Sequence, residues 1–428
     1  MANVRPFCGL RYNTEKVGSL SFVTAPPYDI ISDTEQESLV TRHKNNIITL
    51  ELGKTYKTDD DNNNRYTRAR DCMNEWISLD VLRKDDTPSY YIYEEIFEIS
   101  GTTRRLRGII SAVELVPFSE KIVLPHEETL SKAKADRFNL MSETHANFSP
   151  VYFLYMDEKK TVSSIISDVC SGKAPDESFT TDDKIIHNMW IVNDKSTCSI
   201  IENSFKDKQL FIADGHHRYE TALNFSKTLP ENYGARHILA FSVEMDDPGL
   251  VVLPTHRIVK NIENFNEENV LSQLNVFFDI HKVYADNIEK TAERLLEENI
   301  AEITFVFYTG NDYFHLLKLK DYDAMSKLLP EKSEAYRKLD VSVLHTLILD
   351  KIFNINTENM ANQKNLLYTK FSTEAIDTVK ENQANCSFLL NGTKIRQIKD
   401  VSLNNEKMPQ KSTYFYPKLI TGLVINKF

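Results

Sequence analysis

The sequence QLFIADGHHRYE, at residues 209–220, is the most informative stretch of this chain. Its first part, Gln209–Ala213, is a short apolar run typical of a buried strand, and Asp214-Gly215 is typical of a turn. The residues that follow, His216–Leu229, repeat apolar side chains at helical spacing. These apolar positions are Tyr219, Ala222, Leu223 and Phe225. A strand, a tight turn and a helix are therefore expected in direct succession.

The expected turn has the chemistry of an anion site. The first N–H groups of a helix lack partners within the helix and lie at the positive end of its dipole. Gly215 permits a tight turn and lets a ligand approach the backbone. His216, His217 and Arg218 add positive or donor groups beside those N–H groups. Asp214 is suited to accept a substrate proton, orient a histidine or hold Mg²⁺.

Two alternative hypotheses for this motif stay open. Asp214 could cap the helix while the cations face solvent, but a cap does not require His216, His217 and Arg218, and cations oppose the dipole at this end. Zinc binding by the two histidines is disfavoured because neighbouring helical positions point about 100° apart. The sequence therefore favours a phosphate or another anion and leaves the metal ligands unknown.

A second group of charged residues lies between Leu124 and Arg137. Here His126 or Glu127 could act as an acid or a base. Lys134 and Arg137 are three residues apart on an expected helix, so they share a face and suit a phosphate or carboxylate. An exposed, charged helix is the alternative.

Three shorter segments are further candidates. A proline ends the strand before residues 255–257 and presents their side chains together. Residues 411–413 precede an aromatic run that ends at Lys418, and aromatic side chains with a lysine can stack on a base. The rigid turn at residues 26–29 is either a binding edge or a corner of the chain. The residues expected to bind substrate are His126, Thr255, His256, Arg257, Lys411, Ser412 and Thr413.

Composition narrows the class of protein. The chain has 428 residues and a net charge of −11, which disfavours a broad nucleic-acid surface. Only 12 residues are glycine, and neither GxGxxG nor GxxxxGK[ST] occurs, which excludes the familiar nucleotide-binding loops. The five cysteines are scattered, which argues against a disulfide framework or a structural zinc site. Without a long apolar run or the pattern of a signal peptide, we expect a cytoplasmic protein.

Local patterns indicate a mixed α/β fold, in which strands and helices both recur along the chain. We expect a strand over residues 46–52, a helix over 65–82, and a hairpin formed by 90–99 and 105–115. The expected regions are an N-terminal mixed α/β region at 1–155, a core with the Asp214–Arg218 motif at 156–262, a small β-α-β-β subdomain at 263–332, and a C-terminal region at 333–428 that packs back on the core.

Five ordered motifs resemble those of a bacterial and archaeal family known as domain of unknown function 1015. They lie at residues 25–29, 124–137, 213–222, 253–257 and 408–413. The resemblance therefore covers nearly the whole chain, although the family name itself carries no activity.

The segment Asp214–Arg218 is also similar to the motif of ParB/sulfiredoxin-like folds, which include nucleotide-binding ParB proteins, sulfiredoxins and free serine kinases. In those proteins the turn and the helix N-terminus hold nucleotide phosphates. This resemblance implies a βα phosphate-binding core with additional α/β subdomains. A sulfiredoxin needs a reactive cysteine near the turn, and residues 209–222 contain none. The DNA-binding branch is not supported by the net charge of −11.

The resemblance implies a nucleotide-dependent phosphotransferase that acts on a small hydroxylated metabolite, with free L-serine as the favoured acceptor. ATP or ADP and Mg²⁺ would be its cofactors. His216, His217 and Arg218 would stabilise the transferred phosphate, with Gly215, Lys134 and Arg137 as further phosphate-binding residues. Glu127 or Asp214 would accept the hydroxyl proton.

The partners implied are a small-molecule substrate and a nucleotide, without nucleic acid or membrane, and a homo-oligomer stays open. Two alternatives come from other classes of protein. One is a regulatory protein that binds a nucleotide without turnover. The other is a phosphate-ester or nucleotide hydrolase that uses the same pocket.

Overall fold

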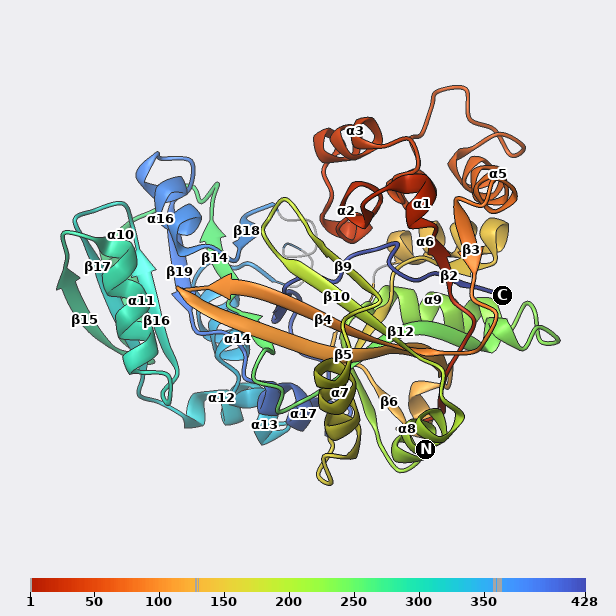
Figure 1. Ribbon diagram of the computed structural model, residues 1–428. Coiled ribbons are helices and arrows are strands. Elements are labelled where there is room, and N and C mark those ends of the chain that lie inside the picture. Colours follow the sequence, from red (N-terminus) through yellow and green to blue (C-terminus); the bar gives the residue numbers. More distant parts are fainter. Residues whose placement is uncertain (1, 128, 130, 357–358, 360–363) are drawn as a thin grey trace. The chain divides into compact units, whose positions relative to one another are not determined.

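The computed structural model describes residues 2–127, 129, 131–356, 359 and 364–428 (Figure 1). These residues form two compact units. Unit 1 comprises Met1–Pro125, Thr129–Leu250 and Pro417–Phe428, and unit 2 comprises His126–Glu128 and Val251–Tyr416. The described part of the chain has no helix long and apolar enough to cross a membrane.

Unit 1 is built around a nine-stranded mixed sheet. Eight strands follow the order β6-β11-β8-β12-β5-β4-β10-β9, and β1 pairs with β5. The pairs β6–β11 and β8–β12 are parallel, and the remaining pairs are antiparallel. The strands are β1 (Val4–Arg5), β4 (Tyr90–Ile99), β5 (Thr102–Glu114), β6 (Val123–Leu124), β8 (Val151–Tyr155), β9 (Glu177–Thr180), β10 (Ile186–Val192), β11 (Leu210–Asp214) and β12 (His237–Glu244).

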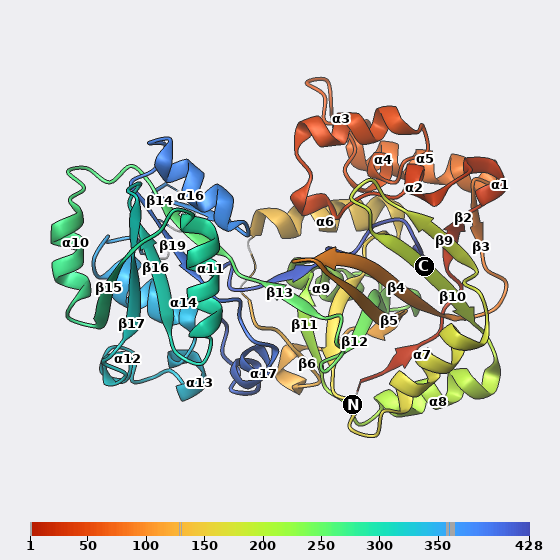
Figure 2. The same ribbon diagram turned by 60° about the vertical axis from the view of Figure 1, so that its left-hand side comes forward.

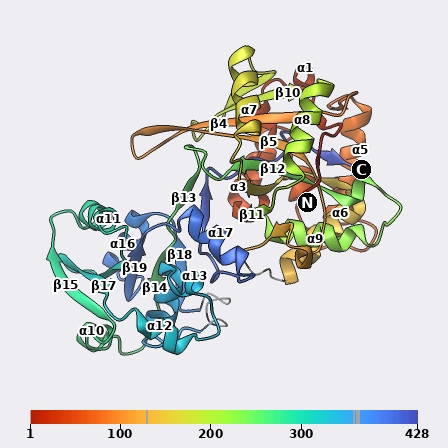
Figure 3. The same ribbon diagram turned by 90° about the horizontal axis from the view of Figure 1, so that it is seen from below.

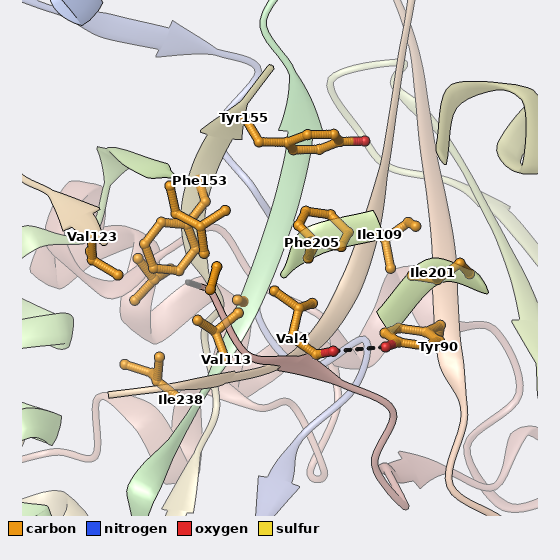
Figure 4. Packing of buried hydrophobic residues seen from close by; sticks show 14 of the residues in the cluster. Val4, Tyr90, Ile109, Val113, Val123, Phe153, Tyr155, Ile201, Phe205 and Ile238 are labelled. Carbon is orange, nitrogen blue, oxygen red and sulfur yellow. Dashed lines mark hydrogen bonds between the residues drawn. The ribbon is translucent and has the colours of Figure 1, made fainter. Parts of the chain in front are cut away.

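Helices cover this sheet because they bury apolar residues at helical spacing against it. Figure 3 shows α7 and α8 side by side. The core beneath them joins Tyr155 of β8 to Phe205 of α8, whose ring centroids are 4.8 Å apart (Figure 4). In the same core the Tyr90 hydroxyl donates to the Val4 carbonyl at 2.8 Å. These helices are α6 (Ser131–Thr144), α7 (Thr161–Gly172), α8 (Lys195–Phe205) and α9 (His216–Ser226).

The remaining elements of unit 1 lie mostly in its N-terminal part, and apart from α3 and α5 they are short (Figure 1). They are β2 (Leu10–Tyr12), α1 (Thr14–Val17), α2 (Leu20–Val23), η1 (Tyr28–Ile30), α3 (Asp33–Arg42), α4 (Ile48–Glu51), α5 (Arg65–Ser78), β3 (Leu82–Lys84), η2 (Phe118–Glu120), β7 (Ala146–Asn147), η3 (Gly234–Arg236) and β21 (Asn426–Lys427).

Unit 2 contains a six-stranded sheet in the order β15-β17-β16-β19-β14-β18. Helices α11 and α16 pack on one face of it, and their apolar residues form a common core (Figure 2). Its elements are β13 (Val251–Leu253), β14 (His256–Val259), α10 (Glu267–Leu274), β15 (Phe278–Tyr284), α11 (Ile288–Glu298), β16 (Thr304–Tyr308), β17 (Tyr313–Leu319), α12 (Asp323–Leu328), α13 (Glu334–Arg337), α14 (Asp340–Val343), the π-helix η4 (Leu344–Asp350), β18 (Leu366–Thr369), α16 (Ser372–Lys380), β19 (Cys386–Leu390), α17 (Ile395–Leu403) and β20 (Tyr414–Tyr416).

The mixed α/β class and most of the expected elements are confirmed. The predicted hairpin is formed by β4 and β5, and the predicted strand, turn and helix are β11, Gly215 and α9. Two of the region boundaries expected from the sequence, after residues 155 and 332, fall between strands of one sheet. Strand β4 pairs with β10 although residue 155 lies between them in the sequence, and β16 pairs with β19 although residue 332 lies between them.

The strand predicted over residues 46–52 is wrong, because Ile48–Glu51 form the helical turn α4. Asn46 causes the difference. Its side-chain amide donates to the Phe22 carbonyl at 2.8 Å, and its side-chain oxygen accepts from the Ile48 N–H at 3.0 Å. These bonds fold a β-branched segment into a turn that sequence propensity assigns to a strand. The helix predicted over 65–82 is also too long, since α5 ends at Ser78 and Leu82 begins β3.

Candidate functional site

The turn between β11 and α9 depends on glycine. Gly215 has φ of +93° and takes the N-cap position of α9. A Cβ atom built on it would lie 3.1 Å from Cζ of the Arg218 guanidinium. Both the left-handed backbone and this close approach disfavour any larger residue. The prediction that Gly215 forms a tight turn between the strand and the helix is therefore confirmed.

Asp214, at the end of β11, holds two cations. One carboxylate oxygen accepts from Nη2 of Arg218 at 2.7 Å, and the other accepts from Nζ of Lys418 at 2.7 Å. Arg218 is buried and also donates to the Pro150 carbonyl. Sequence reasoning included Arg218 but missed Lys418, which lies 204 residues from its partner and has only its neighbouring aromatic run as a signal.

The charge state of Asp214 follows from these contacts. Burial alone would raise the pKa of this carboxyl group, but Lys418 and Arg218 outweigh burial and hold the pKa well below its usual range. His216, buried in the first turn of α9, contributes in the same direction. His217, the next residue, is partly buried. Asp214 is thus an ionised group at neutral pH and a weak proton acceptor.

Arg137 belongs to a buried charged cluster in unit 1. Its Nε donates to Asp136 Oδ2 at 2.8 Å, and its Nη2 donates to the Glu51 carbonyl at 3.0 Å. Its guanidinium carbon lies 3.8 Å from the ring centroid of Tyr28. Arg137 and Arg218 both line a small cavity of about 30 Å³. The structure therefore brings Arg137 together with the motifs at residues 26–29 and 213–222.

Lys134 has different partners from Arg137, although the two were expected to share one helix face. Its ammonium group donates to Glu220 Oε2 of α9 and to the Thr129 hydroxyl, both at 3.0 Å. Thr129 in turn donates to the same Glu220 oxygen at 2.7 Å. Lys134 therefore ties helix α6 to helix α9 beside the Asp214 turn.

The remaining predicted residues gather around the loop at 409–413 in unit 2. The Lys411 N–H donates to Glu127 Oε1 at 3.3 Å, and the Thr413 hydroxyl lies 3.1 Å from Nε2 of His126. The Thr393 hydroxyl donates to the Ser412 carbonyl at 2.7 Å. Lys411 has φ of +57°, and its side chain is exposed at this turn.

Arg257 is fully buried and contacts the same loop. Its Nη2 donates to the Lys411 carbonyl at 3.2 Å, and it also donates to the Thr255 carbonyl and to Nε2 of His345. Burial lowers the pKa of Arg257 to about 10, so it stays charged at neutral pH. His256, whose pKa burial lowers to about 3, accepts from the Leu390 N–H at 3.3 Å.

The structure thus divides the predicted site residues into two groups. One group lies in unit 1 around the β11–α9 turn, and the other lies in unit 2 around the loop at 409–413. Among the residues that the structure describes, no group of three histidine, cysteine, aspartate or glutamate side chains is arranged to hold a metal ion. The sequence offered Lys418 only as part of an aromatic run and did not single out Glu51, and their contacts with Asp214 and Arg137 form only when distant segments meet.

The fold and the site define a mixed α/β protein with clustered cations and one partly buried aspartate at a strand-to-helix turn. The chain belongs to the family described as "Protein of unknown function (DUF1015)", whose model matches residues 4–342. Comparison with curated proteins gives no match.

Several solved structures are similar to the chain at low identity. A mutant free serine kinase in complex with ADP is 12% identical, with a TM-score of 0.34, over 72% of this chain and 87% of that chain. A conserved hypothetical protein from Pyrococcus furiosus is 13% identical, with a TM-score of 0.32, over 72% and 90%. SbnI with C-terminal truncation from Staphylococcus aureus is 10% identical, with a TM-score of 0.35, over 74% and 86%. Similarity at this level establishes no function.

Proposed function

We propose that this protein is a nucleotide-dependent phosphotransferase that acts on a small hydroxylated metabolite, with ATP or ADP as donor. Free L-serine, which would give O-phosphoserine, is the favoured acceptor. The observation that carries the proposal is the pair of cations gathered at the N-terminus of α9. There Arg218 and Lys418 share one carboxylate, Asp214, beside the first N–H groups of the helix. An anion is the ligand that such a site binds best.

The residues have distinct roles in this proposal. The backbone at Gly215 and the first turn of α9 would hold a phosphate group, because glycine has no side chain to keep a ligand away from the turn. His216, His217 and Arg218 would stabilise the charge that develops on the transferred group. Asp214 would keep Arg218 and Lys418 in place rather than remove a proton, since its pKa is lowered. Glu127, the other residue expected to accept the hydroxyl proton, belongs to unit 2 and is assigned no step here.

The described residues do not fit a magnesium ion held by the protein alone. Both oxygens of Asp214 are engaged by cations. Mg²⁺ commonly binds through phosphate oxygens and one or two carboxylates. We therefore assign no step to Mg²⁺, and in the assay it accompanies the nucleotide.

The test is to incubate the purified protein with ATP or ADP, Mg²⁺ and L-serine and to look for O-phosphoserine by ³¹P NMR. Serine-dependent formation of phosphoserine is the expected result. Saturable nucleotide binding without product would replace the proposal with a regulatory protein. Release of free phosphate that does not depend on serine would replace it with a hydrolase.

A variant of His217 tests the location of the site. H217A should reduce nucleotide binding or turnover at least about tenfold, because it removes a donor from the first turn of α9. Since His217 is only partly buried, the thermal midpoint should change little. N224A, farther along the same helix and exposed, is the matched control and should keep wild-type activity. Full activity in H217A would show that the site lies elsewhere.

A further inference from the structure

A row of polar side chains crosses the end of the unit 1 sheet, apart from the β11–α9 turn. The Tyr93 hydroxyl of β4 lies 2.9 Å from Glu95 Oε1 and 2.6 Å from Nδ1 of His187 on β10. The Nε2 atom of His187 lies 2.9 Å from the Thr181 hydroxyl, which lies 2.6 Å from Oδ1 of Asp183. Glu95, Tyr93 and His187 are buried, whereas Asp183 is exposed. The row therefore runs from the interior to the surface.

The number of protons in this row is fixed by its contacts. Each hydrogen bond needs one proton, and the row contains four contacts. The neutral side chains of Tyr93, His187 and Thr181 supply one proton each. One more proton must therefore reside on Glu95, on His187 as an imidazolium, or on Asp183 for all the contacts to be hydrogen bonds.

Burial decides where this additional proton resides. It disfavours the charged form of both buried groups, so it raises the pKa of Glu95 to about 8 and lowers the pKa of His187 to about 4. Both shifts favour the additional proton on Glu95 rather than on His187 at neutral pH. The donors then all point outward: Glu95 donates to Tyr93, Tyr93 to His187, His187 through Nε2 to Thr181, and Thr181 to Asp183.

The charges around the row are mostly acidic. Burial has the largest effect on the pKa values of Tyr93, Glu95 and His187. The negative charge of Asp183 has a smaller effect and raises all three pKa values. On the inner side, the Glu95, Asp247 and Asp214 carboxylates act on Tyr152 of β8. At the outer end, Arg42 of α3 pairs with Asp182 at 2.6 Å.

Packing isolates the row from these neighbours. Phe179 of β9 stacks on His187, with ring centroids 5.0 Å apart. The second oxygen of Glu95 is buried without a hydrogen-bond partner. Within the part of the chain that the structure describes, the imidazole of His187, at 3.8 Å, is the one basic group within ion-pairing distance of Glu95.

We propose that Glu95, Tyr93, His187 and Thr181 form a proton-binding site with an outlet at Asp183. The site holds one exchangeable proton at neutral pH and releases it along the row. On release, one proton passes from Glu95 to Tyr93, from Tyr93 to Nδ1 of His187, from Nε2 to Thr181, and from Thr181 to water through Asp183. Glu95 becomes a carboxylate, the remaining protons satisfy the inner contacts, and the contact between Thr181 and Asp183 opens.

The direct test follows the carboxyl group of Glu95. Infrared spectra of protein labelled with ¹³C-glutamate should show a protonated carboxyl band at neutral pH that disappears with a midpoint near pH 8. Asp340, whose pKa burial raises to about 7, could also give a protonated carboxyl band near neutral pH. Because only glutamate carries the label, the shifted band does not come from Asp340. The band should be absent from E95Q and present in E98Q, an exposed residue of the same strand. Absence of the band in the wild type at neutral pH, or its survival in E95Q, would overturn the proposal.

A second measurement needs no variant of Glu95. The proposal requires the neutral imidazole of His187 to carry its proton on Nε2 below the Glu95 midpoint of about pH 8 and on Nδ1 above it, because the row reverses. Nitrogen chemical shifts distinguish the two tautomers, and H187Q assigns the signal. A single tautomer on both sides of the midpoint, or an imidazolium at neutral pH, would contradict the proposal.

Discussion

Among single residues, Lys418 has the clearest energetic consequence, because it holds one oxygen of Asp214. The lowered pKa of Asp214 contributes stability above the unfolded pKa of about 3.9, and this stability is lost as pH falls toward the folded value. K418M should therefore lower the free energy of unfolding at neutral pH by about 1–3 kcal/mol. Urea denaturation at about pH 7 and about pH 3 measures the difference. An equal loss at both pH values would show that the ion pair is not its cause.

A second prediction for a single residue concerns Gly215. G215A introduces a Cβ atom 3.1 Å from the Arg218 guanidinium at a φ of +93°. It should lower the free energy of unfolding by about 1–3 kcal/mol and disturb the site at the same time. G172A is the matched control, because a Cβ there meets nothing within 4 Å, and it should change stability by about 1 kcal/mol or less. Similar losses in the two variants would contradict the conformational argument.

At the scale of elements, prediction from sequence succeeded where local pattern decides the structure. The aromatic and β-branched residues of β4 and β5 and the apolar spacing of α9 are properties of short segments, and the structure contains these elements. The pairing of Asp214 with Lys418 depends on segments 204 residues apart, which no local pattern encodes. The same limit explains why the strand predicted for the segment of α4 is wrong, since the Phe22 carbonyl that Asn46 binds belongs to helix α2, 24 residues away.

The helical turn α4 gives the prediction at this scale. N46A removes the bonds to the Phe22 carbonyl and from the Ile48 N–H, and Asn46 is fully buried. Leaving buried backbone groups without partners should lower the free energy of unfolding by about 2–4 kcal/mol. Urea denaturation measures this loss, with exposed N224A as the control. A loss as small as that of N224A would show that Asn46 does not determine this turn.

At the scale of the whole molecule, the two units can be followed separately. The chain has only two tryptophans, Trp76 of α5 and Trp190 of β10, and both lie in unit 1. Tryptophan fluorescence therefore reports the unfolding of unit 1, whereas circular dichroism reports both units. Because multidomain proteins depart from two-state behaviour, the fluorescence transition is the appropriate measure for variants of unit 1.

Within the polar row, Glu95 and His187 contribute to the pH dependence of unit 1 stability with opposite sign. Glu95 has a folded pKa of about 8, above its unfolded value, so the folded state holds an extra proton and stability falls as pH rises from about 4.5 to 8. His187 has a folded pKa of about 4, below its unfolded value, so stability rises from about pH 4 to 6.5. The contributions of these two groups cancel between about pH 4.5 and 6.5, and of the two only the fall due to Glu95 continues up to about pH 8.

E95Q separates these contributions, because glutamine keeps a donor toward Tyr93 at every pH. The wild-type free energy of unfolding, minus that of E95Q, should fall by about 1.4 kcal/mol per pH unit between about pH 4.5 and 8. Fluorescence-detected urea denaturation across this range measures the slope, with E98Q, at an exposed position of the same strand, as the matched control. A flat profile for E95Q would mean that Glu95 titrates alike in the folded and unfolded chains. In that case the sheet would bury a carboxylate beside a neutral imidazole, which desolvation makes energetically unfavourable.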